Sequence, residues 1–282
     1  MQHLEHFAPL AARYGGFIVD LWGVVHDGVA PYPGAVECLR RLRDAGRRVV
    51  LLSNAPRRAG VAAAGMRTMG ITADLYTGIV TSGEVTHALL RDRDLPAFAA
   101  LGRRLYHIGP ERDRNVFVGL DYVDVARPAD ADFVLNTGPD DTRVPTEVSP
   151  WFEELAACRA AGLAMVCANP DLEVIRGGAR VICAGALALH YASLGGQVLW
   201  VGKPDPAVYR PVFAELALPP GDVLAVGDAL RTDIAGAAAV GVDACWVLGG
   251  IHGAGLAGPE TAEAAARAAG LAPRATLPAF RW

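Results

Sequence analysis

Near its beginning the chain reads FIVDLWGVV over residues 17–25. A continuous apolar run, without alternation of polar and apolar residues, predicts a strand that is buried on both faces of a sheet. The run ends at Asp20, and a turn of small and apolar residues follows it. A carboxylate at this position either caps the next element or faces a site beyond the end of the strand.

Three further apolar runs share this arrangement, because each of them is followed by a polar side chain in a turn. The runs and their polar residues are 49–52 with Ser53, 198–201 with Lys203, and 224–226 with Asp228. Helical patterns lie between or after the runs, and this alternation of strands and helices predicts an open parallel sheet. Ligands bind beyond the carboxyl ends of such strands, so we expect the four polar side chains to form one site.

The chain from Ser53 to Lys203 is far longer than a single crossover between parallel strands requires. It contains strand-like and helix-like segments of its own, at 105–108, 133–135, 150–161 and 163–167. We therefore predict an inserted α/β domain. The predicted division of the chain is a first part of the core at 1–80, a cap domain at 81–183 and a second part of the core at 184–282.

The expected site contains groups that suit phosphoryl transfer. Asp20 can attack phosphorus to form an acyl phosphate, which water later breaks. Ser53 can donate its hydroxyl hydrogen to a phosphate oxygen, and Lys203 supplies a positive charge. Asp228 and Asp233 bring two more carboxylates near Asp20, and three such groups repel one another unless a cation lies between them. Mg²⁺ prefers hard oxygen ligands and bridges to phosphate, so it is the expected ion.

Composition excludes several other classes of protein. The net charge of −4 argues against a nucleic acid as the main partner. No apolar stretch reaches the ~18–20 residues that a membrane-spanning helix needs, and the first residues do not resemble a signal peptide. The five cysteines are scattered without CxxC spacing, which supports neither a zinc site nor a disulfide framework. We expect a cytoplasmic protein that does not contact membranes.

Four ordered segments resemble the motifs of the haloacid dehalogenase-like superfamily. They are residues 20–25, 51–54, 202–206 and 227–233. Their order and the large insertion after the second segment resemble the branch called class IIA, which includes pyridoxal-phosphate, phosphoglycolate and nucleotide phosphatases. Residues 168–171 and 184–187 are similar to patterns at the end of the cap in that branch. The resemblance implies an α/β fold with a Rossmann-like parallel-sheet core and an inserted α/β cap domain.

The resemblance also implies roles for residues of the core. Asp20 would be the nucleophile and a metal ligand. The main-chain carbonyl of Trp22 and the carboxylate of Asp228 would also face Mg²⁺, and Asp233 would bind it through water or support the other ligands. The phosphoryl-binding residues would be Ser53 and Lys203, with Asn54 shaping the loop that follows Ser53.

Substrate choice would depend on the cap. Asn169 and Asp171, near the end of the cap, are the candidates for contacts that select the substrate. The expected partner is a small phosphorylated metabolite. Caps of this branch often support dimers, so the resemblance makes a homodimer the expected assembly.

One position departs from the pattern of the family. Phosphatases of this superfamily carry a second aspartate two residues after the nucleophile, where this chain has Trp22. Loss of a general acid–base typically costs ~10²–10⁴-fold in rate. Another group such as His26 or Asp27 could replace it, the substrate could have a good leaving group, or the protein could bind its ligand with little turnover.

The sequence therefore predicts a Mg²⁺-dependent phosphohydrolase that forms an aspartyl phosphate on Asp20. The alternative is a phosphometabolite-binding protein with weak or no turnover.

Overall fold

The computed structural model describes residues 1–251 and 258–282. Its largest element is a seven-stranded sheet in which every neighbouring pair of strands is parallel. In sheet order the strands are β1 (Gln2–His3), β14 (Ala275–Leu277), β13 (Asp243–Val247), β12 (Val223–Gly227), β2 (Gly16–Val19), β3 (Arg48–Ser53) and β4 (Gly78–Thr81). The predicted parallel-sheet α/β fold is confirmed.

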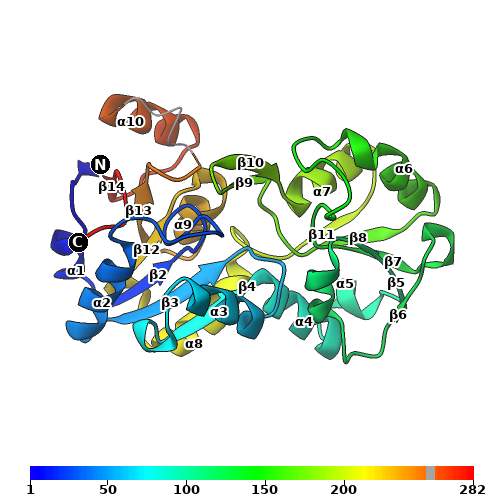
Figure 1. Ribbon diagram of the computed structural model, residues 1–282, viewed down its shortest axis with the longest axis horizontal. Helices are drawn as coiled ribbons and strands as arrows, with labels where there is room; N and C mark the ends of the chain where they lie inside the picture. The colour runs from blue at the N-terminus through cyan, green and yellow to red at the C-terminus, as the bar shows by residue number, and fades with distance from the viewer. Residues whose placement is uncertain (252–257) are drawn as a thin grey trace.

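The helices are short and are distributed over both ends of the molecule (Figure 1). The α-helices are α1 (Ala8–Ala11), α2 (Ala35–Asp44), α3 (Ala59–Thr68), α4 (Ser82–Asp92), α5 (Pro96–Ala99), α6 (Phe152–Ala160), α7 (Ala184–Ser193), α8 (Tyr209–Leu216), α9 (Ala235–Ala239) and α10 (Pro259–Ala268). The 3₁₀-helical segments are η1 (Ala73–Leu75), η2 (Glu111–Val116), η3 (Pro128–Asp130), η4 (Ser149–Trp151), η5 (Pro206–Val208) and η6 (Pro220–Asp222), and η7 (Leu230–Ile234) is a π-helical turn. None of the described helices combines the length and the apolar character that crossing a bilayer requires.

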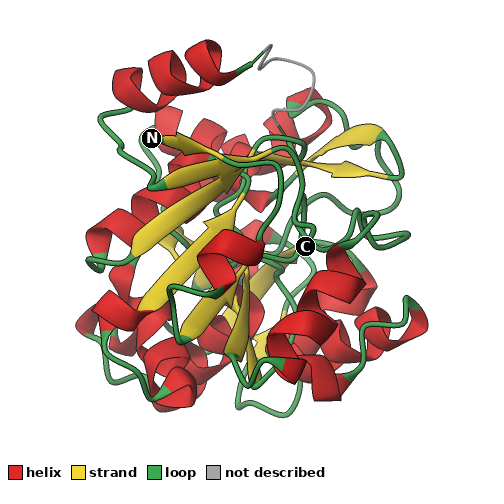
Figure 2. Ribbon diagram, turned by 90° about the vertical axis from the view of Figure 1, so that its left-hand side faces the viewer, coloured by secondary structure: helices red, strands yellow, loops and turns green. Residues whose placement is uncertain are grey.

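The seven-stranded sheet lies between two apolar cores. Phe17 and Val19 of β2 belong to one core, together with Leu39 of α2. Ile18 of the same strand belongs to the other, together with Val212 of α8. Successive side chains of a strand point to opposite faces, so a sheet covered on both faces needs an unbroken apolar run. Figure 2 shows helices on both sides of these strands.

A second parallel sheet forms the other end of the molecule (Figure 1). Its strands, in sheet order, are β11 (Val198–Trp200), β8 (Ala164–Cys167), β7 (Phe133–Asn136), β5 (Arg104–Ile108) and β6 (Val123–Asp124). Leu155 of α6 and Tyr191 of α7 pack on one face. Leu90 of α4 and Phe98 of α5 pack on the other.

The structure corrects one strand assignment. We expected residues 198–201 to join the sheet that contains Asp20, but β11 pairs with β8, with Val198 opposite Met165. Helix α7 likewise packs in the core of the five-stranded sheet. An apolar run predicts a buried strand without specifying its partner, because pairing depends on packing far along the chain. The division of the chain at 81 and 183 stays a prediction, and this pairing favours an end of the cap after Trp200.

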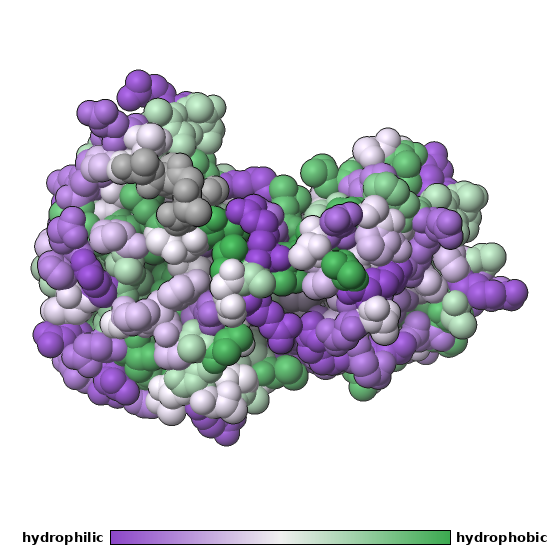
Figure 3. Space-filling view, turned by 45° about the horizontal axis from the view of Figure 1, so that its top comes forward, coloured by the Kyte–Doolittle hydropathy of each residue, from purple (hydrophilic) through white to green (hydrophobic). Residues whose placement is uncertain are grey.

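A two-stranded antiparallel hairpin, β9 (Glu173–Arg176) and β10 (Ala179–Ile182), lies between the two sheets (Figure 1). Its turn is Gly177-Gly178, and both residues have positive φ angles of 55° and 80°. Glycine adopts this left-handed conformation without a steric penalty. The space-filling view shows that the surface dips between the two ends of the molecule (Figure 3).

Candidate active site

Asp20 lies directly after β2, and the buried ammonium group of Lys203 links it to Asp233 and to the backbone of Leu52. The Nζ atom of Lys203 donates hydrogen bonds to Asp20 Oδ1 and to Asp233 Oδ1, each at 2.6 Å, and to the carbonyl oxygen of Leu52 at 3.1 Å. Only 3% of the Lys203 surface is exposed. Burial alone would lower the pKa of Lys203, but the adjacent Asp20 and Asp233 carboxylates raise it above its usual value. The lysine therefore remains charged.

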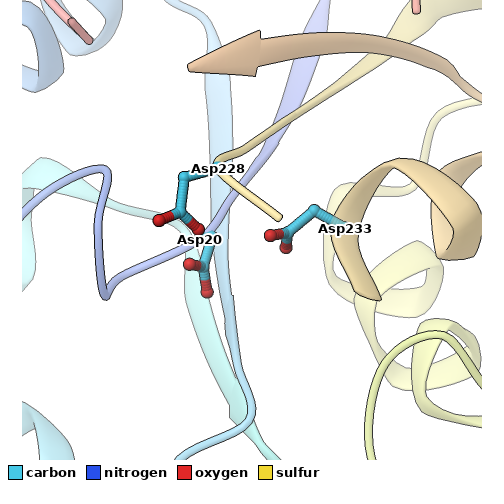
Figure 4. Close-up of side chains that lie close together, drawn as sticks. All are labelled: Asp20, Asp228 and Asp233. Atoms are coloured by element: carbon cyan, nitrogen blue, oxygen red, sulfur yellow. The ribbon is translucent and has the colours of Figure 1, made fainter. Parts of the chain in front are cut away.

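Three carboxylates meet at this end of the sheet. Asp20, Asp228 and Asp233 each offer an oxygen atom, and these atoms lie within 4.8 Å of one another (Figure 4). Burial, reinforced by the neighbouring Asp233 carboxylate, raises the pKa of Asp228 to about 8. One lysine cannot balance three carboxylates, so the site has room and charge for a proton or a cation. A buried set of hard oxygen donors suits Mg²⁺.

The backbone around Asp228 requires glycine at close range. A Cβ atom on Gly23 would lie 1.8 Å from Asp228 Oδ2, and Gly23 has a φ angle of 80°. The same oxygen accepts a hydrogen bond of 2.7 Å from the backbone N–H of Ile251. The turn after Asp20 and the turn after Asp228 are thus packed against each other, which fixes the spacing of the carboxylates.

Asn54 forms hydrogen bonds with both Lys203 and Asp171. Its Oδ1 atom accepts a hydrogen bond from the backbone N–H of Lys203 at 2.7 Å. Its Nδ2 atom donates to the Lys203 carbonyl oxygen at 3.2 Å and to Asp171 Oδ1 at 2.8 Å. Ser53 is 1% exposed, and its Oγ atom accepts from the backbone N–H of Ala55 at 3.2 Å. Neither Ser53 nor Asn54 lines either of the two cavities described below.

The two cap candidates lie next to this network. Asn169 is 7% exposed, and its Oδ1 atom accepts a hydrogen bond from the backbone N–H of Asp171 at 2.9 Å. Between them, the carbonyl oxygen of Pro170 accepts a hydrogen bond from Arg231, which lies in η7. The structure therefore brings Asp171 to the core, whereas Asn169 supports the loop that carries it.

Two neighbouring cavities lie near the carboxylates, and only the first is lined by them. The first, of about 260 Å³, is lined by Asp20, Lys203, Asp228 and Asp233, and by apolar side chains that include Leu172, Val174, Ile175, Leu230 and Ile251. The second, of about 320 Å³, is lined by charged side chains that include Arg57, Arg112, Asp113, Arg143 and Arg176. Of the residues that the structure describes, Trp22, Asp171 and Val174 line both cavities.

Trp22 lies where the two cavities meet. A Cβ atom on Gly28 would lie 2.1 Å from Cη2 of Trp22, so the indole ring packs directly over that glycine. The ring also makes an edge contact with His26, with ring centroids 5.4 Å apart. The side chain is thus held by the loop that follows it, and it has no group that can exchange a proton near neutral pH.

Sequence reasoning missed a charged pair between Arg57, in the loop after β3, and Asp113 of η2. Arg57 Nε and Asp113 Oδ1 lie 3.5 Å apart, and neither atom has a hydrogen-bond partner among the described residues. Burial raises the pKa of Asp113 to about 6. The position of Arg57 soon after Ser53 was the only signal, because Asp113 is far away in the sequence and does not come directly after a strand.

Comparison with known proteins identifies related enzymes. The family described as haloacid dehalogenase-like hydrolase matches residues 17–123, and a second family described as HAD-hydrolase-like matches residues 200–275. D-glycerol 3-phosphate phosphatase of Mycobacterium tuberculosis is 32% identical over 252 residues, which are 87% of this chain and 66% of that protein. Ribonucleotide monophosphatase NagD of Escherichia coli is 29% identical over 242 residues, which are 83% of this chain and 87% of that protein.

Solved structures lead to the same group of proteins. A hydrolase of the haloacid dehalogenase-like family from Brucella suis has a TM-score of 0.84 at 34% sequence identity. The comparison covers 98% of this chain and 99% of that chain. The chain therefore spans slightly less than two thirds of the mycobacterial relative and nearly all of the Brucella protein.

Proposed function

We propose a reaction for this chain, which belongs to the haloacid dehalogenase-like hydrolase family, in its class IIA branch. We propose that it is a Mg²⁺-dependent phosphatase that acts on a small phosphorylated metabolite. Relatives that share most of the chain are named as phosphatases. The observation that carries the proposal is the position of Asp20, which lines a cavity with its Oδ1 atom held 2.6 Å from Lys203 Nζ.

Asp20 would act as the nucleophile. One of its carboxylate oxygens would form a bond to phosphorus while the bond from phosphorus to the leaving group breaks. Lys203 would hold that carboxylate in position and offset the charge on the transferring phosphoryl group. Ser53 and Asn54 would complete the phosphoryl-binding loop, with Asn54 fixing Lys203 through both of its amide atoms.

A divalent cation fits the donor set beside the nucleophile. Asp20, the carbonyl oxygen of Trp22, and Asp228 would hold it, and Asp233 would bind it through water or support the other ligands. When bound, Mg²⁺ supplies positive charge that neutralises the carboxylates and the phosphate oxygens. The cluster offers only oxygen donors and carries more negative than positive charge, which supports a hard cation.

The end of the molecule that contains the five-stranded sheet would select the substrate. The leaving group would extend from the first cavity past Trp22 into the second, which charged side chains line. Asp171 and Asn169 would contribute to this selection because their loop forms part of the boundary. We propose that the cap consists of residues 81–183 and that β11 also belongs to its sheet.

Phosphate release from 4-nitrophenyl phosphate tests the proposal. Wild-type protein should release phosphate only with Mg²⁺, and Asp20→Asn should abolish the release. The exposed Asp94, which lies outside both cavities, provides the matched control as Asp94→Asn. If wild-type protein released no phosphate while a phosphorylated ligand and Mg²⁺ still raised its Tm together, the protein would be a binder rather than an enzyme.

A further inference from the structure

Trp22 occupies the position where related phosphatases carry their proton donor, so the proton must come from elsewhere. We propose that Asp171 is the general acid and general base of this enzyme. The inference rests on the proposed phosphatase function and names a catalytic residue that this function lacks.

The two groups nearest to Trp22 in the sequence are poorly placed for this role. His26 is 4% exposed and lines neither cavity, and its Nδ1 atom accepts a hydrogen bond of 3.0 Å from the backbone N–H of Gly28. Burial lowers the pKa of His26 to about 4, so its ring is neutral. Asp27 also lines neither cavity, and its Oδ1 atom accepts hydrogen bonds from the backbone N–H groups of Val29 and Ala30. Both side chains stabilise their own loop.

Other acidic groups of the two cavities are already paired. Among the described residues, Glu173 forms an ion pair with Arg180. The remaining acids of the second cavity and their partners are Asp113 with Arg57, Asp140 with Arg143, and Asp141 with Arg112. Asp20, Asp228 and Asp233 face Lys203 and one another. Asp171 has no ion pair within the part of the chain that the structure describes.

Asp171 also lies where a leaving-group oxygen must lie. It lines the cavity of the nucleophile and the neighbouring cavity, a property shared only by Trp22 and Val174 among the described residues. A substrate with its phosphoryl group at Asp20 and its remainder in the second cavity passes between these side chains. Its scissile bond then faces Asp171, the one proton-exchanging group at this boundary.

Hydrogen bonds hold the carboxyl group in place. Asp171 Oδ1 accepts from Asn54 Nδ2 at 2.8 Å, and the backbone N–H of Asp171 donates to Asn169 Oδ1 at 2.9 Å. A Cβ atom on Gly185 would lie 2.4 Å from the carbonyl oxygen of Asp171, so close packing of α7 also fixes this loop. Oδ2 has no hydrogen-bond partner among the described residues, which leaves it available to a substrate.

The surroundings favour a protonated carboxyl group. Burial raises the pKa of Asp171, and the positive charge of Lys203 and the hydrogen bond from Asn54 oppose that shift. The titratable and charged groups that face Asp171 are Lys203, Asp228, Asp233, Arg231, Cys167 and Cys183. A carboxyl group that holds its proton closer to neutral pH is a better acid for this reaction.

The two steps balance in atoms and protons. In the first, an Asp20 oxygen bonds to phosphorus, the bond from phosphorus to the leaving oxygen breaks, and the Asp171 carboxyl gives that oxygen its proton. In the second, water bonds to phosphorus while the Asp171 carboxylate takes its proton, and the bond from phosphorus to Asp20 breaks. Phosphate leaves, Asp20 is again a carboxylate and Asp171 is again protonated.

Aryl phosphates with leaving groups of different basicity test the assignment in Asp171→Asn, which keeps an acceptor for Asn54. For phenyl phosphate, kcat/KM should fall by about 10²–10⁴-fold, because the leaving oxygen needs the proton. For 4-nitrophenyl phosphate, kcat/KM should change little, whereas kcat should fall. The amplitude of the initial burst of nitrophenol should equal the enzyme concentration. The fall of the wild-type pH profile at high pH should disappear in the variant with phenyl phosphate.

Glu173→Gln is the matched control, because it removes a carboxylate of the same cavity and should change kcat/KM by one factor for every leaving group. If Asp171→Asn lowered kcat/KM equally for all leaving groups, or for none, the acid–base role would be wrong. A protein whose Mg²⁺-dependent burst survived Asp20→Asn would instead contradict the proposed nucleophile.

Discussion

The two parallel sheets end in different ways. The seven-stranded sheet presents Asp20 and Asp228 at its carboxyl edge, beside a lysine that cannot neutralise them all. The five-stranded sheet ends β7 with Asn136, whose Nδ2 atom donates to the Ala184 carbonyl oxygen at 2.9 Å and whose Oδ1 atom accepts from the Gly138 backbone at 3.1 Å. The amide of Asn136 at the edge of the five-stranded sheet is hydrogen-bonded within the protein, whereas the edge of the seven-stranded sheet retains excess negative charge. The residues after the strands, rather than the architecture that the two sheets share, thus decide which edge carries unbalanced charge.

The largest expected effect is a difference in phosphate release between variants at the two edges. Asp20→Asn should lower the rate of phosphate release by at least about 10³-fold, because the proposed nucleophile is lost. Asn136→Ala should leave kcat nearly unchanged at a temperature well below its Tm. Steady-state release of phosphate from 4-nitrophenyl phosphate measures both. Similar losses in the two variants would remove the distinction between the edges.

The second prediction concerns the charge balance of each end. Lys203→Met should lower the free energy of unfolding of the metal-free protein by about 3–5 kcal/mol, because it leaves buried carboxylates unpaired. Mg²⁺ should recover part of this loss. The control is Arg104→Met, which removes the ion pair of a half-exposed arginine with Asp132 and should cost about 0–1 kcal/mol. Urea unfolding with and without Mg²⁺ measures the four values, and equal costs would contradict the comparison.

A smaller effect on stability is expected at the edge of the five-stranded sheet. Asn136→Ala should reduce the free energy of unfolding by about 1–3 kcal/mol, because the buried carbonyl oxygen of Ala184 and the N–H of Gly138 lose their partner. The loss should be the same with and without Mg²⁺. A loss that Mg²⁺ reversed would mean that this edge, too, takes part in binding the ion.

The smallest effect is a pH dependence of stability. The pKa of Asp228 is about 8 in the folded protein, above the 3.8 of a free aspartate. Its protonated form is therefore favoured by folding, and this contribution is full below pH ~4 and is lost as the pH rises through about 8. The rise in Tm caused by Mg²⁺ should be larger at pH 8.5 than at pH 6, by a few degrees on the order expected for ~1 kcal/mol. Asp228→Asn should make the two rises equal.

Much of the core site could be predicted because its residues obey a local rule. Asp20 and Asp228 follow apolar strands of one parallel sheet and Ser53 ends another, and such strands end at a common edge. Asp233 belongs to the turn after Asp228, so its place near the cluster followed as well. The predicted roles of these residues stay proposals, as do those of Asn54, Asn169 and the carbonyl oxygen of Trp22.

Lys203 shows where the local rule stops. It follows an apolar run as predicted, but that run belongs to the five-stranded sheet, and the lysine reaches Asp20 from the other side. The approach depends on Asn54, which binds the backbone of Lys203 on both sides. No pattern near residue 203 records that contact, because its partner lies in a different loop far along the chain.

The amino-acid sequence by itself determined the α/β fold, the order of the motifs and the cluster of carboxylates at one edge of the core sheet. These features follow from short-range rules, since periodicity sets the strands and the residue after each strand sets the chemistry at its end. Only the tertiary structure decided which sheet β11 joins, that Trp22 and Asp171 face the same boundary between two cavities, and that Asp113 meets Arg57. Such pairings depend on how distant segments pack, and packing is a property of the whole chain that no local pattern contains.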